Sequence, residues 1–163
     1  MNNKLDQFLI LAKHPVKFRM FLFLHLPAAF LSSVRITNIS SEACSVSVPF
    51  SWFTKNPFKS TYFACLSMAA ELSTGALVMA NTYKRFPGCS MLVIESTANF
   101  AKKATTPTIF TCVDGMLIQN AIEKAYLTNL PQSIKVQTKG LNLLNETVAV
   151  FSFVWSFKVK ASK

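Results

Sequence analysis

Glycine and charged residues are both scarce in this sequence. Only four of its 163 residues are glycine, 15% are charged, and 51% are hydrophobic. This composition excludes a disordered or collagen-like chain and leaves a compact or membrane-seeking one. A chain of this length can bury most of its apolar surface around one core, so we expect a single domain over residues 1–163.

A long uninterrupted apolar run is also missing. The best candidate, residues 18–31, is short and contains Arg19 and Pro27, so it does not predict a spanning helix. A secretory signal is not indicated either, because the apolar stretch 8–11 is brief, Asp6 precedes it, and no small-residue cleavage site follows. We therefore expect a cytoplasmic protein without a membrane span.

The N-terminal residues 1–31 are interpreted as a helical extension that covers one side of the core. The extension is expected to be one amphipathic helix, or two helices that separate near Pro15.

The four cysteines do not have the spacing of metal ligands; they are Cys44, Cys65, Cys89 and Cys112. They form no CxxC pair and have no histidine nearby, so no metal site is predicted. We interpret them as buried, reduced thiols of a reducing compartment, although their even number leaves a disulfide open.

Acidic residues are few, and the formal net charge is +10. A nucleic-acid-binding protein of this charge would show a basic stripe interleaved with exposed aromatics or a known reader motif, and neither is present. No nucleic-acid partner is predicted. The lysines are interpreted as a solvated surface or as an attraction for an anionic ligand such as a phosphate-bearing cofactor.

The order of elements predicts an α+β fold. Residues 34–39 and 43–48 are predicted to form a hairpin, followed by a long helix over residues 59–83. Later strands are predicted at residues 91–97, 108–113, 133–141 and 147–160, with Asp114-Gly115 as a hairpin turn. Residues 116–126 fit a strand or a short helix. A curved antiparallel sheet wrapped around one helix would bury that helix on nearly every side.

The predicted long helix is apolar nearly all round, which is typical of a buried helix. Glu71 is the only charged residue between Lys59 and Lys84. A buried carboxylate costs several kcal/mol unless it is paired, hydrogen-bonded or protonated. Glu71 is therefore interpreted as a functional acid, or else as a buried acid capped by Ser67 or by a hydroxyl on a neighbouring strand.

Residues 56–71, NPFKSTYFACLSMAAE, resemble the hotdog-fold thioesterases, especially the phenylacetic-acid-degradation thioesterase group. The resemblance continues through residues 91–93, 100–104 and 153–158, where the chain is similar to a branch known only as a domain of unknown function. It implies a hotdog fold, with extra N-terminal helices here, and the hydrolysis or binding of acyl thioesters. Coenzyme A would enter only as part of the substrate, with no further cofactor.

The resemblance also implies a set of site residues. Asn56 and Glu71 fall on the catalytic positions, and the predicted substrate-binding residues are Ser60, Tyr62, Phe63, Ala64, Ser67, Lys102 and Lys103. Backbone N–H groups at the helix start would stabilise an oxyanion, and the two lysines would meet coenzyme A phosphates. The family places its site between two subunits, so a homodimer or tetramer is expected.

The sequence departs from the family at the entry to the helix. Tyr62-Phe63-Ala64 stands where the family has His-Gly-Gly. A non-catalytic acyl- or lipid-binding module is therefore the alternative function. Asn56 is equally interpreted as a residue whose side chain forms hydrogen bonds with the backbone of its own loop. Lys102 and Lys103 are also interpreted as a charged surface turn.

Overall fold

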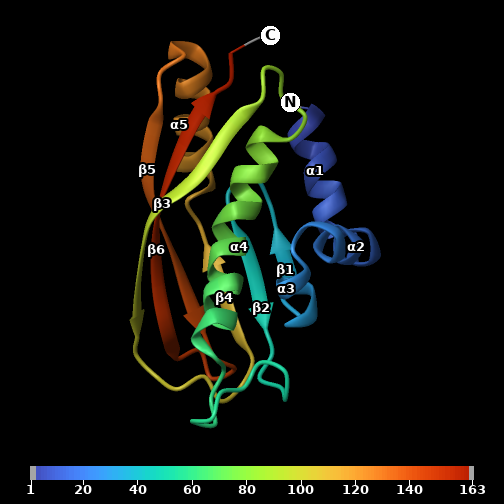
Figure 1. Ribbon diagram of the computed structural model, residues 1–163, viewed down its shortest axis with the longest axis vertical. Coiled ribbons are helices and arrows are strands. Elements are labelled where there is room, and N and C mark those ends of the chain that lie inside the picture. The colour runs from blue at the N-terminus through green and yellow to red at the C-terminus, as the bar shows by residue number, and fades with distance from the viewer. Residues whose placement is uncertain (1–2, 162–163) are drawn as a thin grey trace.

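The computed structural model describes residues 3–161, and its frame is one curved antiparallel sheet (Figure 1). The strands are β1 (Arg35–Ile39), β2 (Cys44–Val48), β3 (Cys89–Phe100), β4 (Thr108–Cys112), β5 (Gln132–Leu141) and β6 (Thr147–Val159). Their order across the sheet is β1-β2-β4-β5-β6-β3, so β1 and β3 are the edge strands. All neighbouring strands pair antiparallel, which confirms the predicted sheet.

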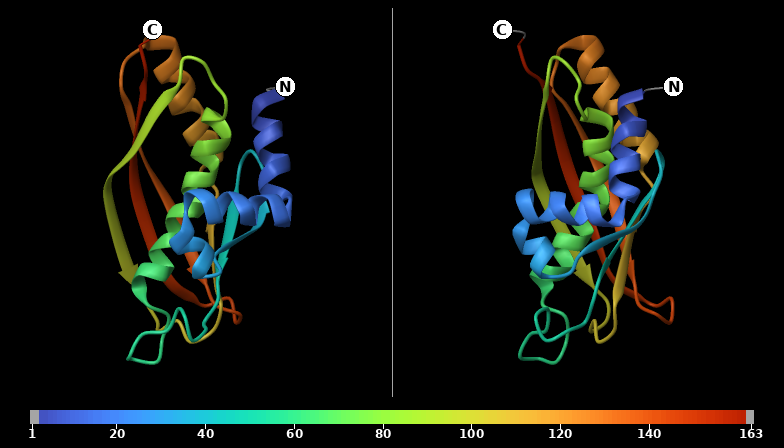
Figure 2. Two further views of the ribbon diagram at one scale, coloured as in Figure 1. Left: turned by 45° about the vertical axis from the view of Figure 1, so that its right-hand side comes forward. Right: turned by 90° about the vertical axis from the view of Figure 1, so that its right-hand side faces the viewer.

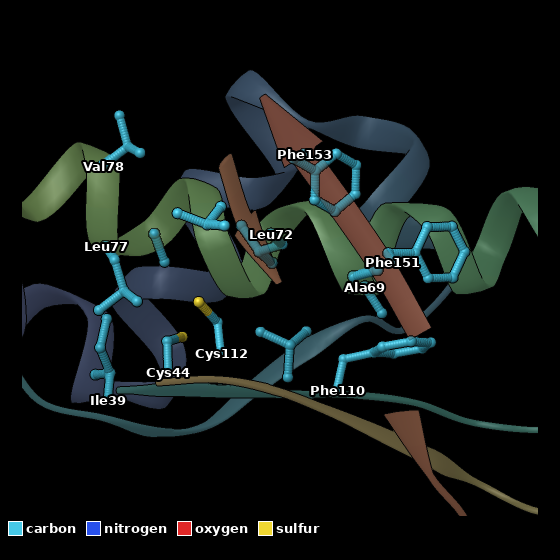
Figure 3. Packing of buried hydrophobic residues seen from close by; sticks show 14 of the residues in the cluster. Ile39, Cys44, Ala69, Leu72, Leu77, Val78, Phe110, Cys112, Phe151 and Phe153 are labelled. Atoms are coloured by element: carbon cyan, nitrogen blue, oxygen red, sulfur yellow. The ribbon is translucent and has the colours of Figure 1, made fainter. Parts of the chain in front are cut away.

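Helix α4 (Phe63–Thr82) lies along the inner side of the sheet (Figure 1). The aromatic face predicted for the last strand is confirmed, since Phe151, Phe153, Trp155 and Phe157 are all buried. Figure 3 shows Phe151 and Phe153 beside the apolar residues of α4. Two buried hydrogen bonds join helix and sheet: Trp155 Nε1 donates to Thr74 Oγ1 at 3.1 Å, and Ser73 Oγ donates to Thr138 Oγ1 at 2.8 Å.

Helix α4 is long and apolar enough to cross a membrane by length and composition, the one described helix of which this is true. Of its apolar window, however, 67% is buried inside the protein. That burial accounts for the apolar composition of α4, because the sheet and the other helices cover its apolar surface.

Helix α4 begins at Phe63, four residues later than predicted. The reason is a turn at Asn56, where Lys59 takes a left-handed conformation with φ 60° and the Asn56 N–H donates to the Ser60 carbonyl. A residue with positive φ cannot continue a right-handed helix. The N-cap is Tyr62, which makes no side-chain cap hydrogen bond.

Three short helices precede the sheet: α1 (Asn3–Lys13), α2 (Pro15–His25) and α3 (Pro27–Leu31). The sequence predicts one helix, or two that separate near Pro15. A third is present because Pro27 as well as Pro15 occupies a position in a first helical turn, where its missing N–H costs nothing. The first two residues of the predicted extension 1–31 lie outside the described residues. Figure 2 shows the three helices grouped on the β1 side of α4.

The predicted hairpin turn at Asp114-Gly115 is wrong. Helix α5 (Gly115–Thr128) begins there, with Asp114 as its N-cap, and this settles the open choice for residues 116–126. A Cβ on Gly115 would lie 2.3 Å from the Ser41 carbonyl oxygen, and the Gly115 N–H donates to the Glu42 carbonyl at 2.9 Å. Glycine is required because the β1–β2 turn passes directly over this backbone.

All four cysteines are free thiols. Cys44 and Cys112 face each other across β2 and β4, and Figure 3 shows their sulfur atoms side by side beneath α4. Burial raises the pKa of both thiols, that of Cys112 to about 11. Both are therefore protonated, unreactive core residues near neutral pH.

Candidate functional site

The loop between β2 and α4 is organised by the side chain of Asn56. Its Oδ1 accepts three hydrogen bonds, from the Phe58 N–H at 3.0 Å, the Ser60 N–H at 3.2 Å and the Ser60 Oγ at 3.3 Å. These contacts fix the orientation of the amide. Its Nδ2 makes no hydrogen bond to any residue that the structure describes, so it remains a free donor.

Asn56 lines a cavity of about 350 Å³ at the N-terminal end of α4. The cavity lies between the Asn56 loop and the segment that follows β3. Thr61 joins the two segments, since both its N–H and its Oγ1 donate to the Ala104 carbonyl, at 2.8 and 3.1 Å. The lining residues are Asn56, Ser60, Thr61, Phe63, Leu66, Phe100, Ala101, Lys102, Lys103 and Ala104.

This cavity is rich in hydrogen-bond donors and has no carboxylate in its lining. Within residues 3–161, the N–H groups of Phe63 and Ala64 have no hydrogen-bond partner, and they carry the partial positive charge of the helix start. Lys102 is paired with Glu146, whose pKa this contact and a hydrogen bond from Asn142 lower. Lys103 makes no ion pair with a described residue. The cavity therefore suits an oxygen atom that carries negative charge.

Glu71 lies elsewhere, on a half-exposed stripe of α4. The residue lines a cavity of about 210 Å³ between α3 and α4, together with His25, Leu26, Pro27, Ala28, Ala29, Met68 and Leu72. Among the described residues, none donates a hydrogen bond to this carboxyl or forms an ion pair with it. Burial raises its pKa above the ordinary value. The predicted capping by Ser67 is wrong, because Ser67 Oγ donates to the Phe63 carbonyl at 2.9 Å.

Asn56 and Glu71 are not brought together within one chain. The two cavities share no lining residue. Glu71 is eight residues beyond Phe63, which at about 1.5 Å per residue places it about 12 Å along the helix from that residue of the first cavity. A hydrogen bond to one shared substrate atom needs about 3 Å.

Of the predicted substrate-binding residues, Ser60, Phe63, Lys102 and Lys103 line the Asn56 cavity. The others do not: Tyr62 is the exposed N-cap with its ring against Phe63, and Ala64 and Ser67 lie on the stripe that carries Glu71. Sequence reasoning missed the residues around Glu71, including His25, to which it assigned no chemistry. Their apolar character is the only local signal, and the helix break at Pro27 is what places them beside α4.

Several solved structures share this fold over nearly the whole chain. A Pseudomonas aeruginosa protein of unknown function, described as a probable thioesterase, has a TM-score of 0.75 and 18% identity, covering 90% of this chain and 97% of that one. The PaaI protein of the Escherichia coli phenylacetic acid degradation operon has a TM-score of 0.62 and 12% identity, covering 95% and 98%. A Haemophilus influenzae thioesterase has a TM-score of 0.62 and 12% identity, covering 88% and 90%.

At these identities the likeness concerns the fold, and it confirms the predicted thioesterase-like hotdog fold. No curated protein matches the sequence. One family profile, "Domain of unknown function (DUF4442)", matches residues 18–138, which include most of α2, all of α3 to α5 and the residues of both cavities. This long match agrees with the branch expected from the sequence, and the chain therefore belongs to the DUF4442 family.

Proposed function

We propose that the protein is an acyl-thioester hydrolase whose site is completed by two copies of the chain, with acyl-coenzyme A as the substrate class. The observation that carries the proposal is Glu71, a largely buried acid beside an apolar cavity, whose carboxyl has no partner among the described residues. An unpaired acid of raised pKa in a cleft is the arrangement that general-base catalysis requires.

Glu71 would take a proton from water while the water oxygen attacks the thioester carbonyl carbon. The carbon–sulfur bond then breaks, and the thiolate takes the proton back from Glu71, which releases a carboxylic acid and a thiol. A raised pKa makes Glu71 a stronger base than an ordinary glutamate and still leaves it ionised above that pKa. The apolar residues beside it would hold the acyl chain.

The Asn56 cavity would bind the negative charge that develops on the carbonyl oxygen. Its donors are Asn56 Nδ2 and the free N–H groups of Phe63 and Ala64, held in place before the substrate arrives. Lys103 would meet the phosphates of coenzyme A at the rim. Lys102 is less available because it is paired with Glu146.

A homodimer would bring the two halves together. Strand β3 is a 12-residue edge strand, paired with β6 alone among the strands that the structure describes, and Leu92, Ile94 and Phe100 are exposed along it. Long apolar edges of this kind pair with another chain. A two-fold pairing would repeat each contact, so that Asn56 of one copy and Glu71 of the other would serve each site.

The proposal is tested with purified protein, a panel of acyl-coenzyme A substrates, and the variants Glu71→Gln and Asn56→Asp. Each variant alone should lose most turnover. When the two variants are unfolded and refolded together, a mixed dimer would contain one site with both native residues. Random pairing should then restore about a quarter of the wild-type turnover per chain.

Two results would count against this proposal. Equal slow hydrolysis by the wild type and Glu71→Gln would remove the catalytic role of Glu71. If both variants lose activity and the mixed dimer does not regain it, the two residues serve the site of one chain. That result would contradict the two-copy arrangement.

The second candidate is a non-catalytic acyl- or lipid-binding module. It is favoured by the apolar lining around Glu71 and by Tyr62-Phe63-Ala64, whose side chains reduce access to the helix start. Native mass spectrometry of freshly purified protein separates the two functions. A co-purifying fatty-acyl species without turnover supports binding, whereas turnover that depends on Glu71 supports hydrolysis.

A further inference from the structure

Helix α2 has two apolar faces, of which the protein covers only one. Phe18 and Leu22 are buried against the core. Val16, Met20 and Leu24 are 68%, 56% and 65% exposed. At about 100° per residue these three point roughly opposite to Phe18 and Leu22. The exposed apolar surface continues over Phe23, Leu26 and Leu31, and we call these six residues the α2–α3 patch.

Cations border this patch. On the helical projection Lys17 and Arg19 lie on its two sides, about 160° apart. The sequence from residue 7 to residue 41 contains no Asp or Glu, but it contains Lys13, Lys17, Arg19 and Arg35. Neither ion pair found among the described residues involves any of the four. None of the four is therefore paired with a described carboxylate, although the Arg19 guanidinium donates to the carbonyls of Phe30 and Val34.

Three of these cations surround one hollow. Lys13, Arg19 and Arg35 line a cavity of about 230 Å³ between α1, α2 and β1, and its lining has no carboxylate. Arg19 also lines the depression formed by Val16, Met20, Phe23 and Phe30, so the basic hollow adjoins the patch. Burial and the charge of Arg35 lower the pKa of Arg19. An anion between the two guanidinium groups would relieve that repulsion.

The patch is separate from the sheet edge invoked for the dimer. Figure 1 shows α2 and α3 on one side of α4 and β3 on the other, and β1 and β3 are opposite edges of the sheet. The patch and the β3 edge therefore do not overlap, although Leu26 of the patch also lines the Glu71 cavity.

We propose that the α2–α3 patch docks on the surface of an anionic lipid bilayer. Val16, Met20 and Leu24 enter the boundary between headgroups and acyl chains, and Lys17 and Arg19, at the two borders of the patch, lie near the lipid phosphates. An exposed apolar helix face bordered by cations can be buried at the boundary between headgroups and acyl chains of an anionic bilayer. A second copy is the poorer occupant, because a two-fold contact would set the same unpaired cations against each other, whereas anionic lipids neutralise them.

The test is co-sedimentation of the full chain with vesicles of phosphatidylcholine alone and of phosphatidylcholine mixed with phosphatidylglycerol. The apolar variant is Met20→Ser with Leu24→Ser. Its matched control is Leu143→Ser with Leu144→Ser, which removes two exposed side chains from the β5–β6 turn. Lys17→Gln tests the charge, and circular dichroism verifies that every variant is folded.

We expect the wild type to sediment with the anionic vesicles and to be released by salt. The Met20→Ser/Leu24→Ser variant should bind at least about tenfold more weakly, Lys17→Gln about fivefold more weakly, and the leucine control as the wild type does. Failure of the wild type to bind, or equal binding by the folded Met20→Ser/Leu24→Ser variant, overturns the proposal. A smaller mass of that variant in light scattering without lipid also overturns it, because the patch would then join copies of the chain.

Discussion

The Oε1 atom of Glu71 lies 2.9 Å from the point that a Cβ on Gly75 would occupy. The carboxyl therefore extends toward the C-terminal end of α4 and lies over Gly75, the one position in the helix that lacks a side chain. The nearest atom of another residue to that point belongs to the Trp155 ring of β6, at 3.6 Å, so the carboxyl lies beside the sheet. Glycine at position 75 allows this placement of Glu71.

Stability should depend on pH through Glu71. Because burial raises its folded-state pKa above the ordinary 4.5, the folded protein keeps a proton that the unfolded chain releases. The free energy of unfolding should thus fall as pH rises from 4.5 through the folded-state pKa. Glu71→Gln should remove this loss and be about 1–3 kcal/mol more stable near neutral pH. Urea unfolding of both proteins across pH measures the difference, which must vanish toward acid if Glu71 is its source.

Turnover should depend on the same ionisation of Glu71, but kcat should rise with pH where the free energy of unfolding falls. If Glu71 is the general base, kcat rises with pH through its raised pKa and then levels. Gly75→Ala should lower kcat by displacing the carboxyl, with Gly88→Ala as the control, because among the described residues a Cβ on Gly88 meets only Lys160, at 3.7 Å. A kcat of Gly75→Ala equal to that of the control would contradict this positioning.

Two substitutions separate the loop role of Asn56 from its proposed donor role. Asn56→Asp keeps an oxygen for the hydrogen bonds from Phe58 and Ser60 but loses the Nδ2 donor. It should stay within about 1 kcal/mol of the wild type and lose about 10²–10³ in kcat. Asn56→Ala should also lose about 1–3 kcal/mol of stability, which thermal unfolding detects. If Asn56→Asp retains full turnover, the residue serves the loop alone.

Gly115→Ala should destabilise the protein by about 1–3 kcal/mol or more, because the added methyl group meets the backbone of the β1–β2 turn. That backbone belongs to a paired hairpin and cannot move aside as a flexible side chain would. Gly88→Ala again serves as the control. Equal urea midpoints for the two variants would show that the β1–β2 turn moves to accommodate the methyl group at little cost in stability.

The β3 edge should control association. Light scattering of the wild type should give a multiple of the 18.1 kDa chain mass. Leu92→Lys places a charge on the exposed edge and should shift the mass toward one chain, whereas Leu127→Lys on exposed α5 should not. A wild-type mass of one chain that persists on concentration would remove the dimer and the two-copy site.

Local pattern was enough to predict most elements. The alternation of aromatic residues along residues 147–160 predicts β6, because a strand with one buried face must alternate. The long run without proline, rich in small residues, predicts α4. The error at Asp114-Gly115 has a physical cause: the same dipeptide suits a hairpin turn and a helix start. The choice was made by the β1–β2 turn, which is distant in sequence but touches Gly115.

The sequence by itself determined that Glu71 is exceptional, since a lone acid in an apolar helix is visible without coordinates. It also determined the fold, because the order of helix and strands and their buried faces admit few arrangements. Only the tertiary structure decided that Asn56 and Glu71 line different cavities and that one face of α2 is left uncovered. The separation of the two cavities depends on where α3 contacts α4, and the exposure of α2 depends on which helix faces the core covers. Contacts of this kind between distant segments leave no periodic signal in the sequence.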